Sequence, residues 1–342
     1  MIKTSTIMQF KCFLLLFISH LQGFSQQETN ALFQKKEILQ IKIEANLKAL
    51  LKDRGQTPQY HWAKLSYLDN QGNTVAFPIK AKVRGNFRRS ATNCSFPPLL
   101  LNFPKKEIKN TLFEHQDKLK LVTECLNEDL VFHEYLAYEI YNILTDFSFR
   151  ARLTEVTYID SLGKKDPDKE FGILLENEVD VAKRNAAKNT YMKNVSMEQY
   201  DSVQMATLVL FEYLVSNNDW SVVVLHNIKQ FTKTGKLFLG VPYDFDHSGI
   251  VEANYALPPP QLEIASVRER LYRGLNYPPS VFQQVFDKFN SAKAQIYALY
   301  QGNPLLSASY IKRTLKYLDE FYEDINDPKA IKKHFVGGRN KN

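Results

Sequence analysis

The chain changes its hydrophobic pattern near residue 125, and this change restricts the possible folds most strongly. Before it, short runs rich in β-branched and aromatic residues alternate with turn residues, which is typical of strands. After it, apolar residues recur at helical spacing over long stretches. The predicted strands are 38–43, 62–67, 75–83, 99–103, 117–122, 153–159 and 171–176, and the predicted helices are 129–145, 197–216, 278–300 and 307–322. A block of strands followed by a mainly helical part, interrupted by two further strands, predicts an α+β fold.

The length of 342 residues is enough for a signal segment and one domain with two lobes. Hydrophobic residues make up 44% of the chain, which argues against disorder over most of it. We expect a β-rich N-terminal lobe at residues 26–126 and a mainly helical C-terminal lobe at residues 127–330. A basic tail at residues 331–342 is expected to be disordered.

The first 25 residues have the pattern of a secretory signal peptide. Lys3 and Lys11 precede a short apolar run, and Gly23 and Ser25 are small residues at the expected cleavage point. Cys12 lies inside the apolar run, so a lipoprotein anchor is not expected. No later apolar run approaches membrane length. The protein is therefore expected to be exported to the periplasm, the cell surface or the medium, without spanning a membrane.

Removal of the signal segment would leave a mildly basic protein. The segment carries two lysines and no acidic residue, so the formal net charge would fall from +7 to +5. Because this charge is small and forms no dense cluster, it does not favour nucleic acid as a partner.

Two cysteines, Cys94 and Cys125, remain outside the signal segment. In an oxidising compartment we expect them to form a disulfide, and the alternative is two buried thiols. The loop they would close is about thirty residues long, which would stabilise the fold by about 3 to 4 kcal/mol on the chain-entropy model. No histidine or further cysteine stands near them at zinc-ligand spacing.

The stretch from residue 217 to residue 249 carries the most chemistry. Asp219 follows a predicted helix, and Asn227 opens an apolar strand. A Lys-Thr-Gly-Lys turn at 233–236 predicts a hairpin whose second strand ends at Asp244 and Asp246. These carboxylates and the carboxamide would then converge on one point. Such oxygen ligands suit a hard divalent cation that carries phosphate, with a separate carboxylate for a hydroxyl nucleophile.

Two other interpretations of this stretch exist. Either half alone is also explained as a polar loop or as the end of a helix. A calcium loop of the EF-hand type is excluded, because Asp244 and Asp246 begin such a pattern but Tyr255 stands where a bidentate Glu is needed.

Taken together, these motifs resemble the spore-coat-protein-H (CotH) kinase-like family. The matching segments follow the family's order from about Lys80 to about Tyr255, roughly half of the chain. They are Lys-Val-Arg-Gly-Asn-Phe-Arg-Arg at 82–89, Phe-Pro-Pro-Leu-Leu-Leu-Asn-Phe at 96–103, Asp-Lys-Leu-Lys-Leu-Val at 117–122, Phe-Gly-Ile-Leu-Leu-Glu at 171–176, and the Asp, His-Asn and Tyr-Asp-Phe-Asp-His-Ser-Gly motifs of residues 219–249. The glycine-rich, His-Arg-Asp and Asp-Phe-Gly motifs of ordinary protein kinases are absent from the sequence. The resemblance implies a protein-kinase-like fold of two lobes.

The resemblance also implies a metal site and a catalytic residue. Asn227 and Asp244 are the first choice as ligands of Mg²⁺ or Mn²⁺, with Asp246 in reserve. Asp219 stands where the family's catalytic carboxylate would accept a hydrogen bond from the attacking hydroxyl. The insert between Asp219 and Asn227 is longer than the four residues of the kinase loop pattern.

A second set of residues is expected to bind the nucleotide. Lys120 alternates with leucines on its predicted strand and is preferred over Lys118 as the nucleotide lysine. Glu134 on the following helix is the expected partner of Lys120, with Glu139 as the competing choice. In addition, Arg84 and Gly85 form a turn whose amides would cradle phosphate, and Glu176 would lie at the linker between the lobes.

The sequence therefore predicts an exported kinase that transfers the γ-phosphate of ATP to Ser or Thr of a secreted or surface protein. The alternative is a catalytically inactive kinase-like module that binds or assembles surface proteins. A metal-dependent hydrolase with the same carboxylates is a third possibility. The acceptor protein, the source of ATP and the oligomeric state do not follow from the sequence.

Overall fold

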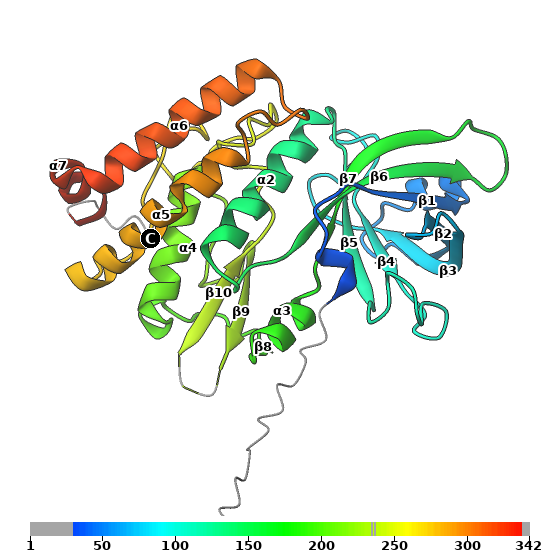
Figure 1. The fold of residues 1–342 in the computed structure, drawn as a ribbon, viewed down its shortest axis with the longest axis horizontal. Coiled ribbons are helices and arrows are strands. Elements are labelled where there is room, and N and C mark those ends of the chain that lie inside the picture. Colours follow the sequence, from blue (N-terminus) through cyan, green and yellow to red (C-terminus); the bar gives the residue numbers. More distant parts are fainter. Residues whose placement is uncertain (1–29, 234, 236, 337–342) are drawn as a thin grey trace, which may run out of the picture.

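The computed structural model describes residues 30–233, 235 and 237–336. A β-rich region and a mainly helical region lie side by side, with the strands of the β-rich region on the right of Figure 1 and the long helices on the left. Each region has its own cluster of buried apolar side chains. The expected α+β composition is confirmed. The predicted signal peptide at residues 1–25 lies outside the described residues.

Within the described chain, seven strands close into a barrel in the order β1-β2-β3-β4-β5-β7-β6. Their bounds are Leu39–Ala45 (β1), His61–Leu68 (β2), Thr74–Val83 (β3), Leu99–Asn102 (β4), Lys118–Thr123 (β5), Ala151–Asp160 (β6) and Asp168–Leu175 (β7). Neighbouring strands are antiparallel except β1 and β6, which are parallel and complete the closure. Side chains alternate between the two faces, so that Leu65, Ile79 and Leu101 fill the interior.

Strands β6 and β7 extend the β-rich region beyond residue 126. The sequence placed both strands in the C-terminal lobe, but β7 pairs with β5 and β6 pairs with β1. Helix α2 (Asp129–Leu144) lies between β5 and β6 in the chain, and it packs against both barrel strands and helices. The predicted boundary between the lobes at residue 126 rests on the local hydrophobic pattern, which carries no information about these long-range strand pairings.

The helical region is built from α4 (Ser202–Val215), α5 (Pro279–Ala298) and α6 (Ala308–Asn326), with α2 packed onto it. Side-chain caps begin two of these helices, since Asp201 accepts from the Gln204 amide and Ser307 from the Tyr310 amide. The predicted helix at 197–216 is divided, because a 3₁₀ turn (Met197–Gln199) ends before α4 begins.

Smaller elements complete the structure. A sheet of β8 (Lys188–Thr190), β9 (Ile228–Thr232) and β10 (Phe238–Pro242) lies beside α4, and its order is β10-β9-β8. The sequence reasoning did not foresee the short helices α1 (Leu47–Lys52), α3 (Glu178–Arg184) and α7 (Pro328–Ile331).

The start of the predicted disordered tail is ordered. Residues Lys332–Val336 continue α7 as a further helical turn, and Phe335 is buried in the helical core, where it contacts Tyr213. The ring of Phe335 explains why this segment is ordered. Its burial stabilises the helical turn by more than the neighbouring basic residues destabilise it. The remaining part of the tail lies outside the described residues.

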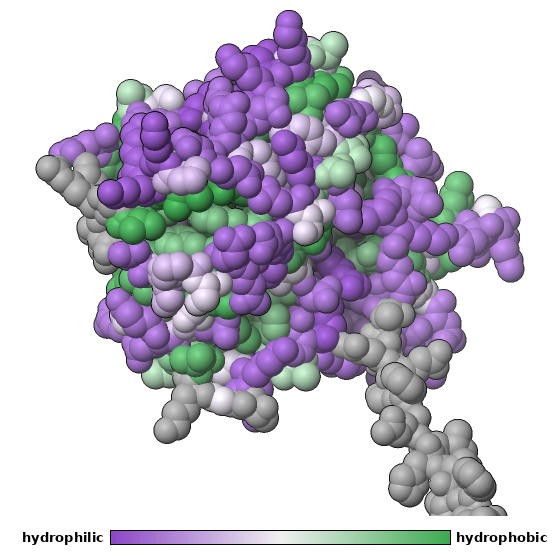
Figure 2. Space-filling model, turned by 60° about the vertical axis from the view of Figure 1, so that its left-hand side comes forward, coloured by the Kyte–Doolittle hydropathy of each residue, from purple (hydrophilic) through white to green (hydrophobic). Residues whose placement is uncertain are grey.

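On the face shown in Figure 2 hydrophilic side chains predominate and apolar patches are interrupted by them. No helix among the described residues is both long and apolar enough to cross a membrane.

Candidate active site

A cavity of about 270 Å³ lies where the turn after β3 approaches the end of β10. Six residues that the sequence singled out line it together, namely Arg84, Gly85, Asp219, Asn227, Asp244 and Asp246. Gly85 has a φ of +92°, a backbone conformation that a side chain would strain, and it turns the chain out of β3 toward the cavity. Residues from distant parts of the chain thus meet at one point.

The β9–β10 hairpin brings the distal residues together. Its strands pair from Ile228 opposite Pro242 to Thr232 opposite Phe238, and the Tyr243 amide donates to the Asn227 carbonyl at 3.0 Å. Asn227 and Asp244 therefore lie beside each other at the open end of the hairpin. The Asp244 amide also donates to the Tyr138 hydroxyl of α2 at 2.9 Å, which fixes the strand end against the core.

The backbone around the cavity is strained. Leu225, Asn227 and Asp244 have φ values of 56°, 50° and 69°, in the left-handed region that residues other than glycine rarely occupy. Each such residue costs about 1 to 3 kcal/mol, and strained residues cluster at functional sites because the surrounding fold holds them in place. Three of the ten residues other than glycine with positive φ in the described chain thus lie in the loop that presents Asp219 and at the end of β10.

Asp219 is held by two neighbours. His226 Nε2 lies 2.9 Å from one carboxylate oxygen, and the Asn227 amide nitrogen donates to the other at 3.2 Å. The hydrogen bond from His226 lowers the pKa of Asp219, and the same bond raises the pKa of His226. Asp219 is therefore ionised and oriented at neutral pH, as a group that accepts a proton or a hydrogen bond requires.

His226 was not among the predicted site residues. The only signal for it in the sequence was its place next to Asn227, and only the reversal of the chain between Ser221 and His226 carries the imidazole back to Asp219.

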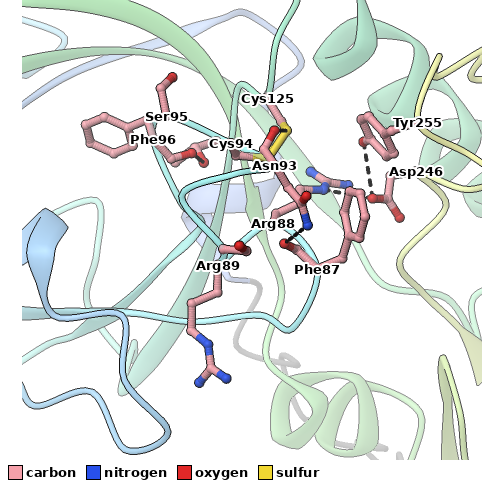
Figure 3. The surroundings of a disulfide bond; sticks show 12 residues. Phe87, Arg88, Arg89, Asn93, Cys94, Ser95, Phe96, Cys125, Asp246 and Tyr255 are labelled. Carbon is pink, nitrogen blue, oxygen red and sulfur yellow. Dashed lines mark hydrogen bonds and ion pairs between the residues drawn. A yellow bond between two sulfur atoms is a disulfide. The ribbon is translucent and has the colours of Figure 1, made fainter.

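Arg88 is the second residue that the sequence reasoning missed. Its guanidinium is buried and donates to Glu134 at 2.6 Å and to Asp246 at 2.8 Å. It lies 4.0 Å from Asp244. The expected pairing of Glu134 with Lys120 is thus corrected: Glu134 does point inward from α2, but its partner comes from the turn after β3. Figure 3 shows Arg88 directed at Asp246 from the loop that contains Cys94.

One guanidinium serves two buried carboxylates at this place. Burial raises the pKa of Glu134 to about 7 in spite of Arg88, and one of its oxygens has no hydrogen-bond partner. Burial also opposes ionisation of Asp246, but the Arg88 and His247 charges outweigh it and lower its pKa. Tyr255 adds a hydrogen bond to Asp246 at 3.2 Å. Asp246 is consequently neutralised by the protein itself.

Lys120 faces a cationic environment. Burial and the charges of Arg84 and Lys229 lower its pKa to about 7, and its ammonium lies 4.2 Å from the centre of the Tyr243 ring. The aromatic face stabilises the charged form only in part. Lys229 is already paired with Glu178 at 2.7 Å, and Lys120 lies behind the cavity lining, but an anion beside Arg84 and Lys120 would still be favoured.

The other two predicted carboxylates lie in structural interactions. Glu176 accepts from the Arg150 amide at 2.9 Å and from the Arg184 guanidinium at 2.9 and 3.0 Å, which ties the end of β7 to α3. Glu139, the competing choice on α2, forms an ion pair with Lys36. The side chain of Glu176 is engaged in this network, and its backbone at the end of β7 remains the predicted nucleotide contact.

The predicted disulfide between Cys94 and Cys125 is present. It joins the loop that carries Arg88 to the segment before α2, which carries Glu134 (Figure 3). Within the same loop the Asn93 amide donates to the Phe87 carbonyl at 2.9 Å. The disulfide therefore lies behind the ionic cluster and restrains both of its halves.

The predicted metal ligands differ in how they fit a cation. The Asp244 side chain is 45% exposed into the cavity, whereas that of Asp246 is 10% exposed and paired with Arg88. Although part of the side chain reaches the cavity, loss of water around the carboxylate and the charge of Asp246 raise the pKa of Asp244, so a cation beside it would be favoured. The Asn227 amide nitrogen is used by Asp219, which leaves its oxygen as the available donor. Asp244 and Asn227 thus fit a hard cation, and Asp246 does not.

Within residues 30–233, 235 and 237–336 no group of three or more His, Cys, Asp or Glu side chains forms a metal-binding cluster. A site with one carboxylate and one carboxamide matches Mg²⁺, which commonly takes one or two protein carboxylates and completes its shell with water and substrate phosphates.

Comparisons with known proteins do not place the chain in a family. No protein-family model matches the chain, and no curated protein matches it. Among solved structures the chain is similar to a Helicobacter pylori proinflammatory kinase, CtkA, with 12% sequence identity and a TM-score of 0.39, over 69% of this chain and 94% of that one.

Proposed function

We propose that this protein is a phosphotransferase of the protein-kinase-like type, which transfers the γ-phosphate of ATP to a hydroxyl. The observation that carries the proposal is the composition of one cavity. Anion-binding groups approach it from the turn after β3, and oxygen ligands with an oriented carboxylate approach it from the opposite side. Phosphoryl transfer needs this division, because the protein mainly positions the two substrates and neutralises charge.

Arg84 and Lys120 bind the phosphates in this proposal, assisted by the amides of the turn at Gly85. Asp244 and Asn227 hold the divalent cation, Mg²⁺ or Mn²⁺, which would supply charge neutralisation to the phosphate oxygens when bound. Asp219 accepts the hydrogen bond from the attacking hydroxyl and orients its oxygen toward the phosphate. His226 keeps Asp219 ionised and fixes the direction of its carboxylate.

The acceptor proposed is a Ser or Thr of a secreted or surface protein. Export is supported by the disulfide, because such bonds persist in oxidising compartments. The predicted signal sequence agrees with this location.

The test measures binding and transfer separately in the purified protein. We expect ATP with Mg²⁺ or Mn²⁺ to raise its melting temperature by several degrees, since saturation at a hundred times Kd stabilises by about 2.7 kcal/mol. Asp244→Ala should abolish this metal-dependent shift. Asp219→Asn should retain the shift but lower phosphate transfer by about 10² to 10⁴, the usual contribution of a positioned base.

Failure has a clear form in each arm. If ATP with either metal does not stabilise the wild type, the nucleotide site is wrong. If the wild type binds ATP but transfers phosphate no faster than Asp219→Asn, the catalytic proposal is wrong.

That second result would favour the alternative, a kinase-like module that binds proteins without catalysis. One observation supports this alternative: Arg88 already neutralises Asp246, so one of the two carboxylates of the Asp-Phe-Asp motif is withdrawn from metal binding. A catalytically inactive site would tolerate Asp219→Asn in every assay.

A further inference from the structure

The outer face of strands β2 to β5 forms a cationic surface near the cavity, on which Lys64 and Lys118 are exposed and Lys80, Lys82 and Lys120 are half-buried. Among the described residues, the outward positions of these four strands carry five lysines and no carboxylate, although Asp117 directly precedes β5; the lysines are Lys64, Lys80, Lys82, Lys118 and Lys120. The strand register makes the surface continuous, since Lys82 is opposite Leu100 and Leu100 is opposite Lys120. Lys64 is paired with Glu44 of β1, which limits the surface on that side.

Two aromatic rings belong to the same surface. Trp62 is 68% exposed, which is unusual for tryptophan, and it lies opposite Lys80 in the register of β2 and β3. The Lys80 ammonium lies 4.7 Å from the Trp62 ring centre, and the Lys82 ammonium lies 4.8 Å from that of Tyr60. The rings hold the two lysine side chains against the sheet, so the positions of their ammonium groups are restricted.

The surface leads directly into the candidate active site. Lys80 and Lys82 are followed along β3 by Arg84, which lines the cavity. Lys120 lies at the other end of the row, beside Tyr243. A ligand bound along this face would therefore reach the cavity without crossing a barrier of opposite charge.

We propose that this face, the outer surface of β2 to β5, docks an extended acidic segment of the acceptor protein next to its phosphorylated hydroxyl. The inference rests on the proposed phosphotransfer for the identity of the partner. Residues two apart on a strand are separated by ~6.6 Å, which is also the spacing of alternate side chains in an extended peptide. Acidic side chains at alternate positions of such a peptide would thus face successive cations along β3.

The arrangement of the rings favours a peptide over single-stranded nucleic acid. Proteins that bind single strands offer aromatic faces on which bases stack. Here the faces of Trp62 and Tyr60 are approached by their own lysines. The modest net charge of the chain, +7 including the predicted signal segment, is also low for a protein that binds polyanions along its length.

The proposal is tested by binding alone, without nucleotide, so that failure of phosphate transfer leaves its outcome unaffected. The probes are a fluorescein-labelled peptide of six Glu-Ser repeats and a matched peptide of six Gln-Ser repeats. We expect the acidic peptide to bind and the neutral one not to bind. Lys80→Gln combined with Lys82→Gln should weaken binding about three- to thirtyfold, as expected for the loss of two exposed ion pairs.

The control variant combines Lys48→Gln with Lys312→Gln. Both of these lysines are exposed and lie on α1 and α6, so the net charge changes equally while the face remains intact. Binding to this variant should equal that of the wild type. Tryptophan emission gives a second readout, because Trp62 is exposed on the face and the chain's other tryptophan, Trp220, is buried.

Three results would overturn the proposal. The first is equal binding of the acidic and neutral peptides. The second is an equal loss in the two double variants, which would show attraction by net charge only. The third is tighter binding of oligothymidine or of phosphatidylglycerol vesicles through the same two lysines, which would assign the face to nucleic acid or to a membrane surface.

Discussion

The two groups of cations beside the cavity differ in how their charges are satisfied. Arg88 is buried and bound to Glu134 and Asp246 at 2.6 and 2.8 Å. Lys120 on β5 is half-buried, and this burial together with the charges of Arg84 and Lys229 lowers its pKa to about 7, against the opposing charges of Asp244 and Glu178. The charge of Arg88 is balanced by close carboxylates of the protein, whereas the charge of Lys120 is balanced only in part, by Asp244 and Glu178.

This difference distinguishes residues that hold the site together from residues that bind a ligand. A cation whose partners are supplied by the fold holds elements together, as Arg88 holds the turn after β3, α2 and the end of the hairpin. A lysine whose pKa is lowered by burial and by like charges has a destabilised charged form, and a bound anion stabilises that form. We therefore assign Arg88 to the architecture of the site and Lys120 to the ligand.

The largest expected effect follows from removing Arg88. Arg88→Met leaves Glu134 and Asp246 buried without a cation, and breaking a buried pair from one side costs about 3 to 5 kcal/mol. The free energy of unfolding, measured with urea, should fall by this amount. Arg89→Met is the matched control, since Arg89 is the next residue and forms one long hydrogen bond to the Gln56 carbonyl at 3.5 Å. Equal stability of the two variants would remove the distinction between the two groups of cations.

A slightly smaller effect is expected from the disulfide, which restrains the loop of Arg88. The two cysteines are 31 residues apart, so replacing both with serine should cost about 3 to 4 kcal/mol on the chain-entropy model. Since the bond lies behind Arg88 and not in the cavity, ATP affinity of the folded variant should be nearly unchanged. A large loss of affinity at temperatures where the variant is fully folded would show that the bond positions the binding groups as well.

The smallest effect concerns Lys120 and its pH dependence. Because its pKa is about 7, the charged form that attracts phosphate prevails below pH 7 and is lost as the pH rises through 7. The affinity for ATP should therefore fall by up to about tenfold between pH 6 and pH 8. In Lys120→Gln this part of the dependence should disappear. Calorimetric titration at several pH values, each in two buffers, measures it. The same pH profile in Lys120→Gln as in the wild type would contradict the role of Lys120.

The site could be predicted from the sequence where local pattern was sufficient. The hairpin at 228–242 needed only two apolar runs and a turn, and its geometry places Asn227 beside Asp244. Helical periodicity likewise placed Glu134 on the buried side of α2. These features depend on residues that are near in the chain, which is why periodicity and turn residues were enough.

The partners of these residues could not be predicted in the same way. The sequence offered Lys120 as the partner of Glu134, and periodicity does not measure which basic residue reaches the carboxylate. The choice of Arg88 depends on the turn at Gly85, the disulfide loop and the packing of α2, all of which are set by distant contacts. The link from His226 to Asp219 depends in the same way on a chain reversal that no turn signature announced.

By itself the sequence determined the α+β composition, most of the strands and helices, the candidate cysteine pair and six of the residues that line the cavity. Local conformational preference and alternation of apolar residues fix these features. Only the tertiary structure decided that β6 and β7 close the barrel, that Arg88 and not Lys120 neutralises Glu134, and that Asp246 is withdrawn while Asp244 faces the cavity. The physical reason is that strand pairing, burial and charge pairing depend on distances in space between residues far apart in the chain.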